Sequence, residues 1–82
     1  MKQLWYFSAP WCGPCKQFGP TMDRIAEQGI IVKKINVDYE PEASTKFGIK
    51  SIPTVILVEN GQETKRFTGA RPIQQVIDFY NG

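Results

Sequence analysis

Two cysteines, Cys12 and Cys15, are the residues of this chain best suited to chemistry, and the chain holds no histidine. A structural zinc site takes four ligands, usually thiolates and imidazoles, so one chain offers only half of one and no metal site is expected. A structural disulfide across so short a loop would stabilise by only about 2 kcal/mol, and a reducing cytosol would open it. The spacing therefore favours thiol–disulfide redox chemistry, in which a thiolate attacks a disulfide.

The cysteine pair lies between a predicted strand and a predicted helix. This places Cys12 at the helix start, where unpaired backbone N–H groups and the positive end of the helix dipole favour a thiolate. Cys15 lies one turn further along on the same side, so it can attack a mixed disulfide at Cys12 from within the molecule. We expect an ionised, solvent-exposed sulfur at Cys12 and a resolving thiol at Cys15.

The length of 82 residues suits one small domain, expected to span 1–82. Hydrophobic residues make up 41% and charged residues 22%, which excludes a disordered chain, and no apolar run is long enough to span a membrane. The net charge is +2 and basic residues form only two adjacent pairs, so nucleic-acid binding is not expected. The apolar stretch at the start is too short for a secretory signal, so we expect a cytoplasmic protein.

The first half of the chain predicts a strand, a helix and a second strand. Residues 2–8 are apolar on both alternating faces, as in a central strand covered on both sides. A helix over 12–28 follows, with a kink at Pro20 and with Phe18, Met22 and Ile25 on its buried face. Residues 30–37 are a β-branched run that predicts a second strand, parallel to the first through a right-handed crossover.

The second half predicts a short helix, a hairpin and a last helix. Residues 38–48 read as a short helical link, and 54–58 as a buried strand. Asn60-Gly61 is a strong hairpin signal, so 62–68 should return antiparallel as an edge strand. Pro72 opens a helix whose apolar residues line one face. The order βαβ-α-ββα predicts an α/β fold with a four-stranded mixed sheet and helices on both faces.

The run from Trp11 to Lys16 is Trp-Cys-Gly-Pro-Cys-Lys, the active-site sequence of thioredoxins, and about residues 4–80 resemble that family. Further stretches match in order along the chain: the helix-kinking Pro20, the strand 34–38, the loop 47–54 and the Gly69-Ala70 loop before the last helix. The expected fold is therefore the thioredoxin-like fold.

The resemblance implies a protein disulfide reductase in which Cys12 is the nucleophile and Cys15 resolves. It further implies that Pro53 follows a cis peptide bond and that Ile52 offers backbone groups to an extended substrate, beside Gly69. Trp11 is expected in the substrate surface, and Gly13-Pro14 is expected to set the redox poise. No cofactor need be bound, because electrons would come from NADPH through thioredoxin reductase. We expect a monomer whose substrates are disulfide-containing proteins.

Two departures from the family stand out. Only eleven residues precede Cys12, so we expect no counterpart here of the leading strand and helix of full-length thioredoxins. Tyr6 stands where most thioredoxins place a buried aspartate that helps to move the proton of the second cysteine, while its usual partner, Lys34, remains. We therefore hypothesise that the proton of Cys15 moves through water or the Tyr6 hydroxyl.

Two other functions stay open. A glutaredoxin-like enzyme using glutathione would suit the short chain, but glutaredoxins usually carry Pro-Tyr where this chain has Gly13-Pro14. A binding subunit of a larger assembly would use the fold and not the thiols. The sequence leaves the target proteins, the redox potential and a cellular or viral origin open.

Overall fold

A computed structural model describes the whole chain, residues 1–82. Its strands and helices follow one another in the order that the sequence pattern predicts. In chain order they are β1 (Lys2–Ser8), α1 (Gly13–Glu27), β2 (Ile31–Asn36), α2 (Pro41–Lys46), β3 (Thr54–Glu59), β4 (Gln62–Thr68) and α3 (Ile73–Asn81). The predicted bounds of β4 match the observed ones, while β2 and α2 are shorter than predicted.

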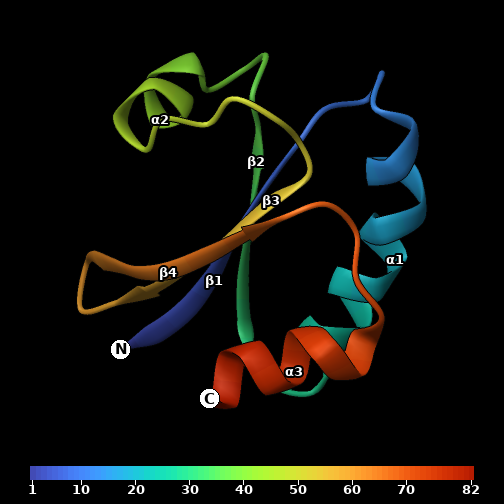
Figure 1. Cartoon of the computed structure of the whole chain (residues 1–82), viewed down its shortest axis with the longest axis vertical. Coiled ribbons are helices and arrows are strands. Elements are labelled where there is room, and N and C mark those ends of the chain that lie inside the picture. The colour runs from blue at the N-terminus through green and yellow to red at the C-terminus, as the bar shows by residue number, and fades with distance from the viewer.

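The four strands form one mixed sheet in the order β2-β1-β3-β4 (Figure 1). β1 pairs with β2 in parallel and with β3 in antiparallel, so the strand that leads into the cysteine pair lies in the centre. β2 and β4 are the two edges. At the β3–β4 turn, Asn60 and Gly61 both have positive φ, which confirms the predicted hairpin.

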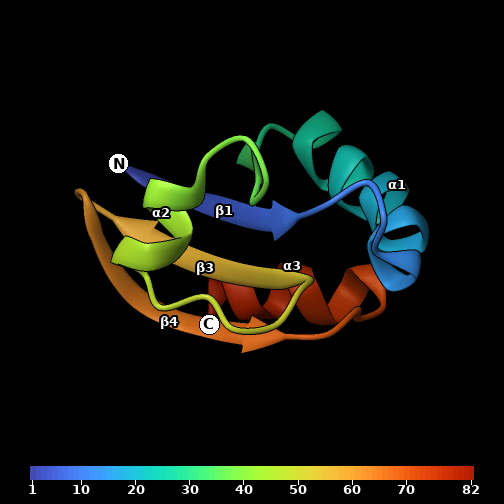
Figure 2. The same ribbon diagram turned by 90° about the horizontal axis from the view of Figure 1, so that it is seen from above.

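Helices cover both faces of the sheet, as predicted (Figure 2). α1 and α3 lie on one face, where Tyr6 of β1 packs with Phe18 and Met22 of α1 and with Val76 of α3. α2 and the segments flanking it cover the other face, where Phe7 packs with Ile35, Ile56 and Val58. The central strand is apolar on both sides because each side meets its own core.

The cysteine pair lies at the start of helix α1, just after the central strand β1. Cys12 is the N-cap of the helix, and Gly13 and Pro14 form its first turn. Pro20 lies inside the helix, where it has no backbone N–H to donate. The helix continues through it to Glu27, and the kink expected there stays a prediction. Phe18, Met22 and Ile25 are buried and hold the helix on the sheet.

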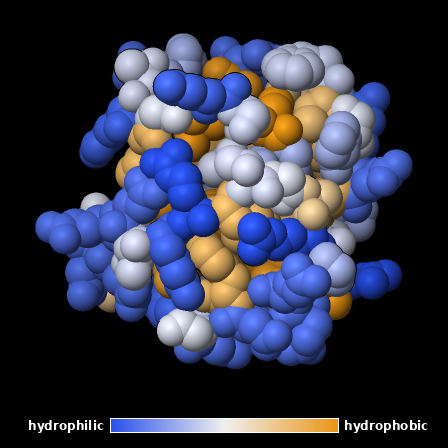
Figure 3. All heavy atoms as spheres, viewed as in Figure 1, coloured by the Kyte–Doolittle hydropathy of each residue, from blue (hydrophilic) through white to orange (hydrophobic).

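Hydrophilic residues lie between the hydrophobic ones on the face seen in Figure 3. Few large apolar side chains lie open to solvent: Met1, Trp11, Ile31 and Tyr39. No helix is long and apolar enough to cross a bilayer.

Candidate active site

Cys12 and Cys15 are joined by a disulfide, with 5.2 Å between their Cα atoms. The sulfur of Cys12 lies 3.2 Å from the backbone nitrogen of Cys15, whose N–H points toward it as in a helix N-cap. No acidic residue lies in the first turn of α1 to oppose a negative charge there. The backbone of α1 is therefore arranged to stabilise an anion on the Cys12 sulfur.

The expectation that Cys12 is openly exposed is wrong for the disulfide form. Cys12 and Cys15 each expose 5% of their surface. They pack with Ala9, Val37 and Ile52, which cover the disulfide from the segments that follow β1 and β2 and that precede β3. Exposure therefore does not distinguish the two sulfurs, but position does: Cys12 precedes the helix beside Trp11, whereas Cys15 belongs to the buried face of α1.

Trp11 stands beside the disulfide and exposes 68% of its surface. Its indole N–H donates a 2.8 Å hydrogen bond to the carboxylate of Asp38, just beyond the end of β2. The N–H of Asp38 in turn donates to the side-chain oxygen of Asn36 at 2.8 Å. The large apolar ring is thus held in place while its face stays open to solvent.

The loop between α2 and β3 brings its backbone up to the disulfide. The Ile52–Pro53 peptide bond is cis, as the resemblance implied. The carbonyl oxygen of Ile52 lies 3.9 Å from the Cys12 sulfur. Neither the N–H nor the carbonyl of Ile52 has a backbone partner within the chain, so both remain free to pair with another chain.

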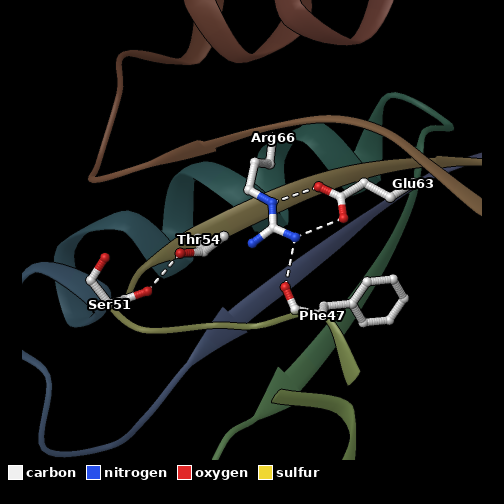
Figure 4. Close-up of polar contacts among 5 residues, drawn as sticks. All are labelled: Phe47, Ser51, Thr54, Glu63 and Arg66. Carbon is white, nitrogen blue, oxygen red and sulfur yellow. Dashed lines mark hydrogen bonds and ion pairs between the residues drawn. The ribbon is translucent and has the colours of Figure 1, made fainter. Parts of the chain in front are cut away.

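Hydrogen bonds hold this loop at several points. The N–H of Gly69 donates to the Pro53 carbonyl at 2.8 Å, which joins the loop before α3 to the site. The Thr54 hydroxyl donates to the Ser51 carbonyl at 2.6 Å (Figure 4). On the far side of the loop, Arg66 of β4 points toward Phe47 and donates to its carbonyl at 2.6 Å (Figure 4). The loop therefore has a fixed place relative to the cysteines.

Two hollows flank the disulfide. One, of about 290 Å³, lies beside Trp11 and is lined also by Val37, Ile49, Lys50 and Ile52. The other, of about 260 Å³, lies behind Cys15. A larger one, of about 410 Å³, lies on α2 among Pro41, Glu42, Thr45 and Lys46 and does not include the cysteines, so size does not mark the site.

Tyr6 and Lys34, predicted to support Cys15, lie next to each other on β1 and β2 and line the hollow behind it. The Tyr6 hydroxyl donates to the backbone carbonyl of Cys15 at 3.1 Å and not to its sulfur. Burial, more than any other cause, raises the pKa of Tyr6, so the phenol stays neutral near pH 7. Lys34 forms an ion pair with Asp23 of α1.

Sequence reasoning missed Asp23 and Asp38 as members of this site. Asp38 had a usable signal, because the carboxyl ends of parallel strands meet at one edge of a sheet and it follows β2 as Trp11 follows β1. Asp23 had none that a sequence reader would separate from an ordinary surface acid. No group of three or more His, Cys, Asp or Glu side chains is placed to hold a metal ion.

Known proteins resemble this chain over most of its length. The thioredoxin family model matches residues 2–81. Thioredoxin of Haemophilus influenzae is 41% identical over 78 residues, which are 92% of this chain and 73% of that protein. Thioredoxin of Alicyclobacillus acidocaldarius is 42% identical over 73 residues, covering 85% of this chain and 70% of that protein.

The fold agrees with a solved thioredoxin as well. The structure of a mutant thioredoxin from Halobacterium salinarum superimposes with a TM-score of 0.92 at 30% identity, over 98% of this chain and 72% of that one. Together with the four-stranded mixed sheet and the disulfide at the start of α1, these similarities establish the family and its thiol–disulfide chemistry. The chain belongs to the thioredoxin family and is a thiol–disulfide oxidoreductase.

Proposed function

We propose that this protein reduces disulfides in other proteins by two successive thiol exchanges at Cys12 and Cys15. The Cys12 thiolate attacks one sulfur of a substrate disulfide and forms a mixed disulfide with it, while the other substrate sulfur leaves as a thiolate. Cys15 then attacks the Cys12 sulfur, releases the second substrate thiolate and closes the Cys12–Cys15 disulfide. The observation that carries this assignment is the Cys12 sulfur at the N-cap of α1, facing the Cys15 N–H at 3.2 Å.

The substrate would lie across Trp11 and the loop between α2 and β3, which carries the cis Pro53 and is called the cis-proline loop below. The unpaired N–H and carbonyl of Ile52 support an extended segment that pairs through its main chain, so its side chains can vary. Pro53 and Gly69 hold Ile52 in place through their 2.8 Å hydrogen bond. The Gly13-Pro14 turn keeps the two cysteines one turn apart and thereby sets the redox poise.

The oxidised protein must receive two electrons before it can act again. We propose that NADPH supplies them through a thioredoxin reductase, that no cofactor is bound to this chain, and that the protein acts as a monomer in the cytoplasm. The Gly13-Pro14 sequence favours this donor over glutathione, which glutaredoxins use with Pro-Tyr between their cysteines.

Insulin reduction with two electron donors tests the proposal. NADPH with thioredoxin reductase should sustain turnover, and NADPH with glutathione and glutathione reductase should not. The Cys12→Ser variant is the control and should be inactive with both donors. Turnover with glutathione alone would make the protein glutaredoxin-like. If a cell's requirement for the protein survived replacement of both cysteines by serine, the fold would be serving as a binding subunit.

A further inference from the structure

A hollow of about 300 Å³ lies between α1 and the segment that joins β4 to α3. In Figure 1 this segment runs alongside α1 on its way from the end of β4 to the start of α3. The hollow is lined by Gln17, Phe18 and Thr21 of α1 and by Ala70, Arg71 and Pro72 of the segment. The hollow beside Trp11 includes residues of α2 instead, so the two hollows belong to opposite layers of the fold.

The segment carries Arg71 away from the place where a substrate would lie. Gly69 donates its N–H to the Pro53 carbonyl at 2.8 Å, and Arg71 follows two residues later. Two residues of extended chain span at most about 7 Å. A substrate segment paired with Ile52 would rise about 3.3 Å per residue, so the long arginine side chain reaches substrate positions about two to four residues from the reacting cysteine.

The guanidinium of Arg71 is positioned but unpaired. It takes part in neither of the chain's two ion pairs. It lies over the ring of Phe67, 4.3 Å from the ring centroid, and that ring is buried in the core between the sheet and the helices α1 and α3. The aromatic face therefore holds the guanidinium in place while its N–H groups stay available to an acceptor from another molecule.

Other donors lie beside the guanidinium. The backbone N–H groups of Ala70 and Arg71 have no backbone acceptor within the chain. Gln17 and Thr21 are four residues apart on one side of α1, and both line the hollow. An amide, a hydroxyl, two backbone N–H groups and a guanidinium thus gather at one place.

The hollow has no negative charge of its own, because no carboxylate lines it. Acids of the two flanking helices are engaged elsewhere: Asp23 of α1 pairs with Lys34, and Asp78 of α3 accepts a hydrogen bond from Gln74. A set of donors around one unpaired cation is suited to an anion, and above all to a carboxylate, which matches the fork of a guanidinium.

We propose that this hollow binds a side-chain carboxylate of the substrate, so that the protein prefers disulfides whose cysteine lies about two to four residues from an aspartate or glutamate. The inference rests on the proposed function, since it names the substrates that the Cys12–Cys15 pair reduces fastest. Arg71 determines specificity and takes no part in the thiol exchange. Its effect is therefore confined to substrates that carry the acid.

Synthetic peptides test this preference. Each is a flexible Gly- and Ser-rich segment with one central cysteine, held in a disulfide with the neutral thiol 2-mercaptoethanol. One series carries a single glutamate at each position from four before to four after the cysteine, and the matched series carries glutamine there. The measured quantity is the ratio of the second-order rate constants for the Glu and Gln peptides with the reduced protein. Both peptides meet the same thiolate, so a change in thiol reactivity cancels in this ratio.

In the wild-type protein the ratio should reach about three to ten at one or two neighbouring positions. It should shrink at high salt, which screens the charge. Arg71→Met, which keeps an apolar contact with Phe67, should lower the ratio to about one, and Arg71→Lys should keep part of it. Lys65→Met is the matched control and should keep the wild-type ratio, because Lys65 also lies over an aromatic ring, that of Phe79, but nearer the β3–β4 turn.

Three results would overturn the inference. A ratio below two at every position would show that the hollow does not select a carboxylate. A ratio that survives in Arg71→Met would assign the selection to other residues, and an equal loss in Lys65→Met would assign it to net charge. The proposed function itself would fail if the wild-type protein reduced none of the Gln peptides, or if Cys12→Ser reduced them equally fast, and the substrate preference would fail with it.

Discussion

The backbone N–H of Cys15 points at the sulfur of Cys12 across 3.2 Å, so the resolving cysteine helps to prepare the attacking one. This contact belongs to the backbone and not to the Cys15 thiol. It therefore persists when the Cys15 side chain is replaced. The free energy of such a charge-assisted contact, together with the helix N-terminus, is of the order of 1–2 kcal/mol, enough to raise the thiolate population about tenfold.

The first prediction concerns the reactivity of that sulfur. In the Cys15→Ser variant, Cys12 is the one thiol left, and it should react with iodoacetamide at pH 6.5 about ten times faster than glutathione does. The Cys12→Ser variant is the matched comparison and should react more slowly than Cys15→Ser. Equal rates for Cys12 and glutathione would contradict the idea that the start of α1 activates the nucleophile.

A pair of glycines allows the second prediction. Gly69 has φ of +88° and donates its N–H to the Pro53 carbonyl, so a side chain there strains the backbone that supports the cis-proline loop. We expect Gly69→Ala to lower the free energy of unfolding by about 1–2 kcal/mol and to raise KM for insulin. Gly19 lies inside α1, where an added Cβ meets nothing within 4 Å. Gly19→Ala should raise the free energy of unfolding by about 0.5–1 kcal/mol.

Urea unfolding of both variants measures these two changes. Both substitutions add the same methyl group, so the opposite signs predicted for the two changes in free energy would come from the backbone conformation at each position. If Gly69→Ala were as stable as the wild type, the left-handed conformation of this loop would not be a constraint on the site.

Local sequence signals predicted much of this fold. The Asn60-Gly61 turn depends on neighbouring residues alone, and the observed strand Gln62–Thr68 has the predicted bounds. The cysteine pair at a strand-to-helix boundary is equally local. The bounds of β2 were less well predicted, because Ile30 and Val37 are β-branched but lie beyond the stretch paired with β1.

The contacts that complete the site could not be predicted in this way. The hydrogen bond from Trp11 to Asp38 and the ion pair of Lys34 with Asp23 join different elements of the chain. Each depends on how α1 and β2 are placed in three dimensions, and no pattern of spacing reports that placement. The role of Tyr6 could not be predicted from spacing either. Its hydroxyl reaches Cys15, but it donates to the Cys15 carbonyl and not to the sulfur.

The third prediction follows from that geometry. Tyr6→Phe removes the 3.1 Å hydrogen bond and leaves the Cys15 carbonyl without this donor, so we expect the free energy of unfolding to fall by about 1–3 kcal/mol. The pH profile of DTNB reduction should not change, because the phenol neither gives nor takes the thiol proton. A shifted profile would restore the tyrosine to the proton path.

The pH dependence of stability provides a second readout for Tyr6. Its pKa in the folded protein is raised above the ordinary value of 10.0, mainly by burial. Above that ordinary value the unfolded chain loses the phenolic proton while the folded protein keeps it, so stability falls as pH rises. Thermal melts at pH 9 to 11 should show this fall in the wild type and a smaller fall in Tyr6→Phe.

The fourth prediction concerns the ion pair that steadies the cis-proline loop from β4. Arg66 donates to both carboxylate oxygens of Glu63, at 2.5 and 2.7 Å, and to the Phe47 carbonyl (Figure 4). The hydrogen bond from Arg66 holds the pKa of Glu63 below its usual value of 4.5. The stabilisation from this carboxylate is therefore complete above that usual value and is lost as pH falls through the lower pKa of the folded protein.

Glu63→Gln keeps an acceptor for Arg66 but removes the charge. Because the pair lies near the surface, we expect it to cost less than about 1 kcal/mol at pH 7, and progressively less as pH falls below 4.5 and Glu63 becomes protonated. Arg66→Ala also removes the bond to Phe47, so part of its cost should remain at low pH and its KM for insulin should rise. Thermal melts of both variants from pH 2 to pH 7 separate the two contributions. Costs that are equal at every pH would show that the charge of Glu63 adds nothing and that Arg66 acts through the Phe47 carbonyl alone.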